Sequence, residues 1–297
     1  MGSLMEAIPM KRRKQTIAPY LYLIPCFAIF AAFVFYPFLR TIVLSFFLTD
    51  TFGNPVFFEG FDNYLRLFRN PHFHNSLRLT FLFAPMVGVP TFVIGYMLAA
   101  VANDRMRGSR LYEVMYSVPM AIASAPAATL WIILLTPGPN GIVNWLFGTE
   151  IRWLLDPQYA LISVAAVTVW LNIGASFIFL LTGFRNVPQE ILESARIDGA
   201  GYFRRLFKII TPIASPQIFF VVFLNITTSF QAFGQIRLMT RGGPSRATEV
   251  MVYSIFENAI RFSRYDIAFS MSVILFLIIL TITLIQFRIE DKVVHYK

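Results

Sequence analysis

Six long stretches of uncharged, mostly apolar sequence alternate with charged segments along the chain. They cover residues 15–39, 79–101, 114–135, 159–184, 213–236 and 267–287, and they are 25, 23, 22, 26, 24 and 21 residues long. About 20 apolar residues in a helix cross a hydrocarbon layer of about 30 Å, so each stretch is long enough to span a membrane. The pattern predicts an all-α, polytopic membrane protein with six transmembrane helices.

The composition excludes two ordinary soluble domains, which the length of 297 residues would otherwise allow. Hydrophobic residues make up 57% of the chain and charged residues 14%, whereas about a quarter of a typical soluble protein is charged. None of the longest connections, at 48–76, 137–158, 185–212 and 237–266, is the size of a soluble domain. We therefore expect residues 1–297 to form a single transmembrane domain.

The positive charges differ between alternate connections, which indicates an orientation rather than nucleic-acid binding, despite the net charge of +9. If the N-terminus is cytoplasmic, the inner segments hold 15 Lys and Arg residues and the outer segments hold 8. Positive residues are enriched in cytoplasmic loops, so both termini are predicted to lie in the cytoplasm. The outer segment 237–266, with five Arg residues, does not follow this rule.

The cytoplasmic connection 185–212 begins with the pattern of a short amphipathic helix. Pro188 suits the first turn of a helix, and apolar residues then recur at the spacing of one helical face, at Ile191, Leu192 and Ala195. Asp198 and Gly199 predict the end of this helix.

A second amphipathic helix is predicted after the turn. Its apolar face consists of Tyr202, Phe203, Leu206, Phe207 and Ile210, and its other face is basic. We expect this helix to end at Pro212 and Pro216.

Two interpretations of this helix pair remain open on physical grounds. A helix lying in the lipid interface accounts for the basic and aromatic second half. The first half suits a knob that enters a groove on a soluble partner, because it combines acidic residues with small residues that permit close approach. The acidic residues are Glu190, Glu193 and Asp198, and the small ones are Ser194, Ala195, Gly199, Ala200 and Gly201.

At these residues the sequence resembles a known family. Residues 193–200 read ESARIDGA, and this segment, followed by Phe203, Ile210, Pro212 and Pro216, is similar to the EAA motif of inner-membrane permease subunits of binding-protein-dependent ABC importers. The segments 61–64 and 242–248 and the six-span layout resemble the carbohydrate-uptake branch, which contains maltose-type and glycerol-3-phosphate-type permeases. Ser194 departs from the Ala of the family motif.

The resemblance implies that the segment is a coupling helix, which sits in a cleft of a cytoplasmic ATPase subunit. Glu193 would pair across the joint, Ala195 would permit close approach, Asp198 would cap the turn and Gly199 would allow the reversal. The positions implied for coupling are Glu193, Ser194, Ala195, Asp198, Gly199, Ala200, Phe203 and Pro212. The implied partners are a second related permease, two ATPase subunits and an extracytoplasmic solute-binding protein, with the chain in a bacterial inner membrane.

The chain is not expected to hydrolyse ATP or to bind a cofactor itself. A phosphate-binding loop of the form G-x-x-x-x-G-K-[ST] needs a Gly-Lys pair, and none of the five Lys residues follows a Gly. ATP and magnesium would therefore bind to the partner ATPase. His72 and His74 lack a nearby Cys or third His, so ordinary loop residues are a better interpretation than a metal site.

The transport path is expected among polar and aromatic residues of the spans, because polar groups there tend to face protein or water. Amides can bind sugar hydroxyls and aromatic rings can stack on sugar rings, and the uncharged spans favour a neutral sugar or oligosaccharide. The candidates are Tyr96, Trp131, Trp170, Asn172, Ser176, Asn225, Thr228 and Gln231. The alternative is that Asn and Ser bond neighbouring helices and that Trp lies in an interface belt.

Other interpretations are kept beside this one. Arg78, Arg237 and Arg241 near the outer ends would attract a phosphorylated substrate such as glycerol-3-phosphate, although solvation explains them more simply. An ion-coupled secondary carrier or a membrane enzyme is disfavoured, because the spans lack a charged residue and no polar catalytic cluster is found. The candidates for docking the binding protein are Asn63, Arg69, Pro137, Gly243 and Pro244.

Overall fold

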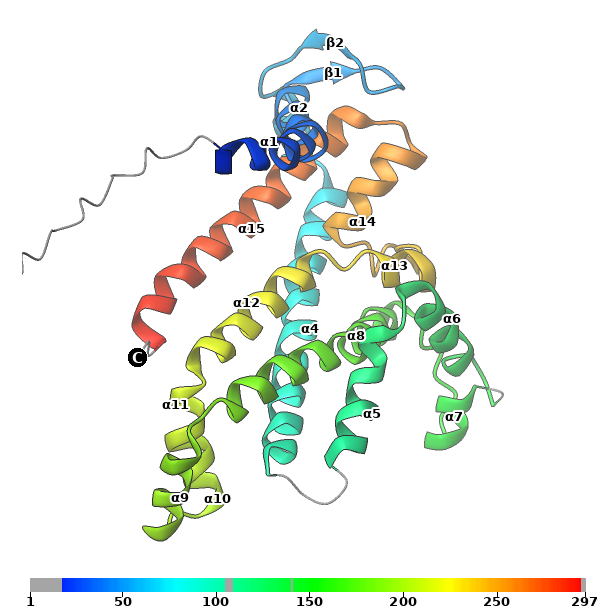
Figure 1. Cartoon of the computed structure of the whole chain (residues 1–297). Helices are drawn as coiled ribbons and strands as arrows, with labels where there is room; N and C mark the ends of the chain where they lie inside the picture. Colours follow the sequence, from blue (N-terminus) through cyan, green and yellow to red (C-terminus); the bar gives the residue numbers. More distant parts are fainter. Residues whose placement is uncertain (1–17, 105–108, 140, 295–297) are drawn as a thin grey trace, which may run out of the picture.

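The computed structural model describes residues 18–104, 109–139 and 141–294. Five helical segments in these ranges are long and apolar enough to cross a membrane, and they cover Tyr22–Leu44, Pro71–Asn103, Pro157–Arg185, Ser215–Met239 and Tyr265–Glu290. A sixth candidate is a bent pair, Leu111–Ala121 and Ser124–Leu134. The predicted all-helical, polytopic architecture is confirmed (Figure 1).

The elements follow one another in this order. They are α1 (Ala18–Phe30), the π-helical turn η1 (Ala31–Phe35), α2 (Tyr36–Leu44), β1 (Phe47–Thr49), β2 (Pro55–Phe58), α3 (Asp62–Phe68), α4 (Pro71–Asn103), α5 (Ser109–Ala121), α6 (Ser124–Leu134), α7 (Ile142–Phe147), α8 (Pro157–Arg185), α9 (Gln189–Ile197), α10 (Tyr202–Arg205), the π-helical turn η2 (Leu206–Ile210), α11 (Thr211–Ile213), α12 (Ser215–Phe230), α13 (Gly234–Met239), α14 (Met251–Phe256), the π-helical turn η3 (Glu257–Arg261) and α15 (Tyr265–Val293).

The two longest early spans begin where the sequence provides a cap and a proline. Asn70 precedes Pro71 at the start of α4, and its side chain accepts a hydrogen bond from the backbone N–H of His72 at 2.9 Å. Asp156 likewise precedes Pro157 at the start of α8, and its side chain accepts a hydrogen bond from the backbone N–H of Gln158 at 2.9 Å. A side-chain acceptor before a first-turn proline satisfies one of the free N–H groups of a helix start, and the proline has no N–H to satisfy. Both helices therefore extend beyond their uncharged cores at 79–101 and 159–184.

The third predicted span, 114–135, is not one straight helix. It is divided into α5 and α6, which are bent by 101° relative to each other. Pro126 lies in the first turn of α6, where it cannot donate a hydrogen bond to the carbonyl of Ile122. Its ring would also clash with that carbonyl in a continuous helix, so the chain breaks at residues 122–123.

The fifth predicted span, 213–236, is also interrupted. α12 ends at Phe230 and α13 begins at Gly234. A Cβ on Gly234 would lie 3.2 Å from the Cβ of Ser124, the first residue of α6, so the two interruptions lie side by side. Non-helical backbone at membrane depth is tolerated where protein covers it or where it lines a water-filled cavity.

The centre of the molecule is the crossing of α4, α8 and α12 (Figure 1). Small residues let these backbones approach, and one point of close approach is Gly95 of α4. A Cβ on Gly95 would lie only 2.9 Å from the Cβ of Ser176 on α8. Apolar side chains in a membrane gain little by exchanging lipid contacts for contacts with another helix. Membrane helices therefore associate through close packing at small residues.

Gly95→Ala is therefore expected to destabilise the protein by about 1–3 kcal/mol, because overpacking forces the two helices apart. The measurement is the thermal unfolding midpoint of the purified chain in detergent. Gly201→Ala is the matched control, since a Cβ at Gly201 meets nothing within 4 Å. Equal midpoints for the two variants would contradict the close approach.

The end opposite to α9 and α10 carries a small hairpin of β1 and β2, which the sequence analysis did not anticipate (Figure 1). Asn63 on α3 holds it: the side-chain amide donates to the carbonyls of Ser45 and Phe47, both at 3.0 Å. Asn63 is fully buried. Its suggested role in docking a binding protein is therefore wrong, because its side chain is used inside the chain.

Three of the five Arg residues in the outer segment 237–266 have side-chain partners within that segment. Arg237 lies over the ring of Phe256, with its Cζ 4.6 Å from the centroid, and Arg261 pairs with Glu257 at 2.8 Å. Arg246 pairs with Glu249 at 3.5 Å, where burial raises the pKa of the Glu249 carboxyl against the opposing effects of Ser254 and Arg246. Local contacts therefore account for three of the five Arg residues that depart from the charge pattern.

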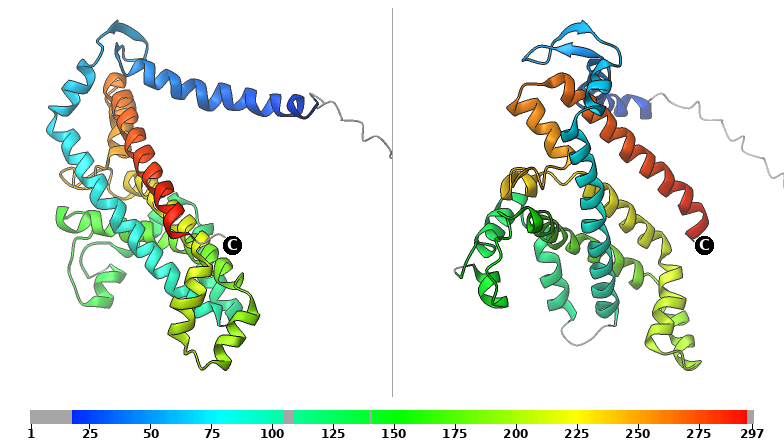
Figure 2. Two further views of the ribbon diagram at one scale, coloured as in Figure 1. Left: turned by 90° about the vertical axis from the view of Figure 1, so that its left-hand side faces the viewer. Right: turned by 180° about the vertical axis from the view of Figure 1, so that it is seen from behind.

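The first helical segment stands apart from the rest. α1 projects away from the other helices (Figure 2), and the apolar window of Tyr22–Leu44 is 0% buried within the chain. Only its final part meets the body, where the rings of Phe38 and Phe276 on α15 are 4.9 Å apart. A long apolar helix without cover from its own chain needs cover from lipid or from another protein.

Candidate functional site

The helical hairpin formed by α9 and α10 begins as the sequence predicts. α9 starts directly after Pro188 and ends at Ile197, with Asp198 as its C-cap. Gly199 then adopts a φ of +73°, and its N–H donates to the carbonyl of Arg196 at 3.0 Å while that of Ala200 donates to Ala195 at 2.9 Å. This paired arrangement around a left-handed residue is the Schellman motif, in which glycine avoids the steric cost of a Cβ.

The second half of the hairpin differs from the prediction that Pro212 ends it. The helix runs from α10 through η2 and α11 to Ile213, and its direction changes at Ala214, ahead of Pro216. In the wide turn η2 the backbone N–H of Thr211 donates to the carbonyl of Leu206. Such a local π adjustment accommodates a proline within a membrane helix, so Pro212 lies inside the helix.

The apolar face of this second half is divided. Leu206 and Ile210 are buried against α4 and α8, in the same cluster as Phe184 and Val187. Phe203 and Phe207 are exposed and stack on each other with centroids 6.5 Å apart. The five residues of the predicted face therefore differ in their surroundings: Leu206 and Ile210 are buried within the chain, whereas Phe203 and Phe207 are exposed.

The exposed aromatic pair continues toward α4. Phe207 stacks on Tyr96 of α4 with centroids 6.4 Å apart, and the neighbouring residues Arg204 and Lys208 are exposed. Aromatic rings beside basic residues suit the headgroup region. The interfacial interpretation thus fits this side of the hairpin.

The tip of the hairpin presents a different surface. Glu193, Ser194, Asp198 and Gly199 are exposed and Ala200 is half-buried, as a docking surface requires. Ala195, however, is only 6% exposed and lies within the chain, so it permits close packing of the hairpin itself.

Sequence reasoning missed Ile197, which is 86% exposed. This isoleucine lies off the face of α9 that carries Leu192 and Ala195. A helical projection of residues 189–197 would have shown an apolar residue on the solvent side. A large exposed apolar side chain at a loop tip is a feature of interaction surfaces.

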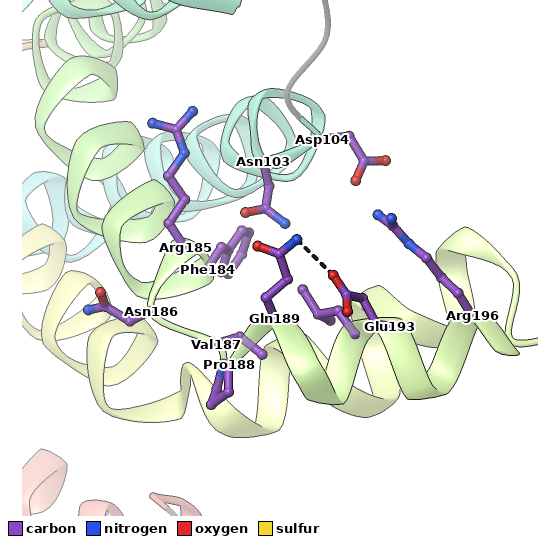
Figure 3. Close-up of a pocket in the computed structure, with 11 residues that line it drawn as sticks. Asn103, Asp104, Phe184, Arg185, Asn186, Val187, Pro188, Gln189, Glu193 and Arg196 are labelled. Carbon is purple, nitrogen blue, oxygen red and sulfur yellow. Dashed lines mark hydrogen bonds between the residues drawn. The ribbon is translucent and has the colours of Figure 1, made fainter. Parts of the chain in front are cut away.

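A cavity of about 790 Å³ separates α9 from the end of α4. Gln189, Glu193 and Arg196 point from one face of α9 toward Asn103 and Asp104 (Figure 3). The amide of Gln189 donates to the Glu193 carboxylate at 2.9 Å. The cavity leaves this face of α9 unpacked, so the hairpin depends on a few contacts at its base for its position.

One of these contacts comes from Tyr202, whose hydroxyl donates to the carbonyl of Ala100 at 2.9 Å. Burial raises the pKa of the Tyr202 phenol, with the charge of Asp104 acting in the same direction. The phenol therefore remains a neutral donor. Because Ala100 lies in the last turn of α4, its carbonyl has no partner within the helix, and Tyr202 supplies one.

The predicted pathway residues fall into separate groups rather than one cluster. Ser176 on α8 donates to the amide oxygen of Asn225 on α12 at 3.0 Å, and both are buried. This bond fits the alternative that Asn and Ser link neighbouring helices. The Nδ2 of Asn225, however, is buried without an acceptor among the described residues, and such an unpaired donor costs about 1–3 kcal/mol.

Trp131 on α6 and Trp170 on α8 form a second group. Their rings meet edge to face with centroids 5.6 Å apart, and the Nε1 of Trp131 has no acceptor among the described residues. Tyr96 lies elsewhere, at the hairpin, where its hydroxyl is 2.5 Å from the Oγ1 of Thr211. Asn172 is half-buried, and Thr228 and Gln231 are exposed near the end of α12.

The three Arg residues that were suggested to attract an anion, Arg78, Arg237 and Arg241, differ in their contacts. All three are exposed, but the guanidinium of Arg237 lies over the ring of Phe256. The ring of His74 hydrogen-bonds the carbonyl of Phe68 at 2.7 Å. Within the described residues, no group of three or more His, Cys, Asp or Glu is arranged to hold a metal.

Comparison with known proteins places this geometry in context. Residues 91–295 match the family "Binding-protein-dependent transport system inner membrane component". The chain is 34% identical over 284 residues to the sn-glycerol-3-phosphate transport system permease protein UgpA of Yersinia enterocolitica, covering 94% of this chain and 96% of that protein. It is 32% identical over 283 residues to UgpA of Agrobacterium fabrum, with 94% and 97% covered.

Solved structures share the fold. A bacterial ABC transporter that imports the acidic polysaccharide alginate matches with a TM-score of 0.82 at 21% identity, over 94% of this chain and 96% of that chain. The bacterial alginate ABC transporter in complex with its alginate pentasaccharide-bound periplasmic protein matches with a TM-score of 0.81 at 20% identity, over 93% and 94%.

Proposed function

Because the chain belongs to the family of inner membrane components of binding-protein-dependent transport systems, we propose that it forms half of the pathway of an ABC importer. As an ABC transporter permease it is a multi-pass, non-catalytic subunit of the inner membrane. The proposed partners are two cytoplasmic ATPase subunits, an extracytoplasmic solute-binding protein and a second related permease. ATP and magnesium belong to the ATPases, and both termini of this chain lie in the cytoplasm.

The hairpin carries the proposal that an ATPase docks here. Its base is fixed in the core through Leu206 and Ile210, while Ile197 and Gly199 stand exposed at its tip. A rigid base with an accessible apolar tip is what a force-transmitting contact requires. Glu193, Ser194, Asp198 and Ala200 would contribute the polar rim and the close approach, with Phe203 and Pro212 on the following helix.

The first helical segment supports the proposal of a second permease. Tyr22–Leu44 has an apolar window without burial inside this chain, and it projects from the body (Figure 2). In a complex, a neighbouring permease and lipid together would cover this surface. One chain then supplies only half of the residues around the pathway.

For the substrate we propose sn-glycerol-3-phosphate or a related phosphodiester, in preference to the neutral sugar or oligosaccharide that the uncharged spans first suggested. The similar permeases are described as part of sn-glycerol-3-phosphate transport systems. Arg78, in the first part of α4, and Arg241, directly after α13, are exposed and would attract the phosphate. An uncharged carbohydrate remains the second candidate.

We place the pathway beside the two helix interruptions. Ser124 and Gly234 bring the ends of α5/α6 and α12/α13 together, and Gln231 lies at the second interruption. Trp131 and Trp170 lie on the helices that lead to this junction, and Asn225 offers its unpaired amide from α12. In many transporters interrupted helices surround the substrate near the middle of the membrane.

The proposal is tested by purifying the tagged chain from its native membrane and reconstituting the complex in vesicles. We expect an ATPase and a second permease to co-purify, and we expect vanadate-sensitive uptake that depends on the binding protein. Labelled sn-glycerol-3-phosphate should be taken up and should be displaced by unlabelled glycerol phosphodiesters but not by maltose. Transport by this chain alone, driven by an ion gradient, would instead support a secondary carrier.

A further inference from the structure

Arg185 connects three helices at the base of the hairpin. It is the last residue of α8, and residues 186–188 separate it from α9. Its Nη2 lies 2.5 Å from the Oε1 of Glu113 on α5, and its Nη1 lies 3.3 Å from the Oε2. A guanidinium that meets both carboxylate oxygens fixes orientation as well as charge.

The same guanidinium also caps α4. The Nη2 of Arg185 donates to the carbonyl of Ala102 at 3.3 Å. Ala102 lies in the last turn of α4, where carbonyls have no partner within the helix and where a positive charge is favourable. One side chain thus ties the end of α4 and the start of α5 to the end of α8.

Arg185 lies between two cavities, so its contacts with Glu113 and Ala102 are important for the position of the α9/α10 hairpin. Arg185 lines the cavity of about 790 Å³ next to α9, and it also lines one of about 580 Å³ along α5 that includes Val114 and Ser117. Neither space is filled by side chains. Movement of the hairpin can therefore be transmitted to α5 through the bridging guanidinium at this level of the membrane.

α5 leads directly to the interrupted part of the third span. It packs tightly on α8, since a Cβ on Gly174 would lie 3.0 Å from the carbonyl oxygen of Tyr116. Beyond Ala121 the chain bends by 101° into α6, whose first residue, Ser124, meets Gly234. A rotation of α5 would therefore also move Ser124 and so the contact at which the two interruptions meet.

We propose that Arg185 is a positioning residue for coupling: with Glu113 and the Ala102 carbonyl it transmits movement of the cytoplasmic hairpin to α5 and so to the interrupted helices. This inference rests on the importer function proposed above. The ion pair is partly exposed, with side-chain exposures of 32% for Arg185 and 26% for Glu113. Pairs of this kind contribute little to folding, so their loss is expected to affect coupling more than stability.

The test measures the number of substrate molecules taken up per ATP hydrolysed by the reconstituted complex. Glu113→Gln and Arg185→Glu are each expected to lower this ratio about five-fold or more, the range typical of coupling between sites. The double variant Glu113→Arg/Arg185→Glu should have a higher ratio than either single variant and a lower one than the wild type, because it restores the ion pair but not the hydrogen bond to the Ala102 carbonyl. Arg288→Gln is the control, because Arg288 is an exposed residue near the cytoplasmic end of α15.

A wild-type ratio in both single variants would overturn the proposal, as would a double variant that is as defective as either single one. If a single variant reduces the yield of the complex, Arg185→Lys replaces it. Its ammonium keeps the charge but lacks the planar fork, so an intermediate ratio is expected and a wild-type ratio contradicts the role. Uptake by the wild-type complex tests the importer function separately, whatever these variants do.

Discussion

Replacing Gly199 with Trp is expected to abolish co-purification of the ATPase while the chain still inserts into the membrane. Gly199 has a φ of +73°, and a Cβ there would meet nothing within 4 Å. An L-residue in this conformation costs about 1–2 kcal/mol, which a local turn can absorb. The indole would then stand at the exposed tip, beside Ile197, and would prevent a partner surface from closing on the hairpin.

Two further variants distinguish the effect of the size of the Trp side chain from the effect of backbone strain at a positive φ. Gly148→Trp places the same side chain in the same conformation, with a φ of +63° and open space, on the C-terminal end of α7 in the 137–158 connection. It should leave ATPase association unchanged. Gly199→Ala introduces the strain without the bulk and should retain most of the association. The measurement is the molar ratio of ATPase to permease after affinity purification, and a normal ratio for Gly199→Trp refutes docking at this tip.

Asn225→Leu is expected to lower uptake about ten-fold or more without weakening assembly. A hydrogen bond to a charged group such as phosphate contributes about 1.5–3 kcal/mol, and 1.4 kcal/mol corresponds to a factor of ten. The Nδ2 of Asn225 has no acceptor among the described residues, so its removal leaves no protein acceptor unsatisfied. Ser176, which loses its acceptor, can turn its hydroxyl to a backbone carbonyl of its own helix.

Ser176→Ala is the matched control for this variant, because it removes the bond between α8 and α12 and keeps the amide. If Asn225 serves the pathway, Ser176→Ala should transport nearly normally. If the only role of Asn225 is to hold the two helices together, both variants should be equally defective and the complex should lose thermal stability. The initial rate of uptake and the unfolding midpoint of the complex distinguish the two results.

Much of the fold follows from local features that the sequence displays directly. Asn70–Pro71 and Asp156–Pro157 mark helix starts, and Asp198–Gly199 marks the end of α9, because caps and left-handed turns depend on residues close together in the chain. The interruption of the third span was also encoded locally, by Pro126. It was missed because an uncharged stretch of sufficient length reads as one span unless proline positions are weighed.

The candidate site was less accessible to sequence reasoning. The residues around Glu193 could be found from their motif, but the burial of Ala195 and the exposure of Ile197 depend on which neighbour covers which face. The pathway candidates were chosen by residue type, and the structure separates Tyr96 at the hairpin from Trp131 and Trp170. Contacts between positions far apart in the chain are not visible in periodicity.

The sequence by itself determined that this is a helical membrane protein with a helix-turn-helix motif between its fourth and fifth predicted spans, because hydrophobic length and local turn chemistry are properties of consecutive residues. Only the tertiary structure decided that two helix interruptions meet at Ser124 and Gly234, and that Arg185 joins the end of α4 to α5. Those contacts depend on how α4, α5, α8 and α12 cross, and the crossing is set by close backbone packing at small residues such as Gly95.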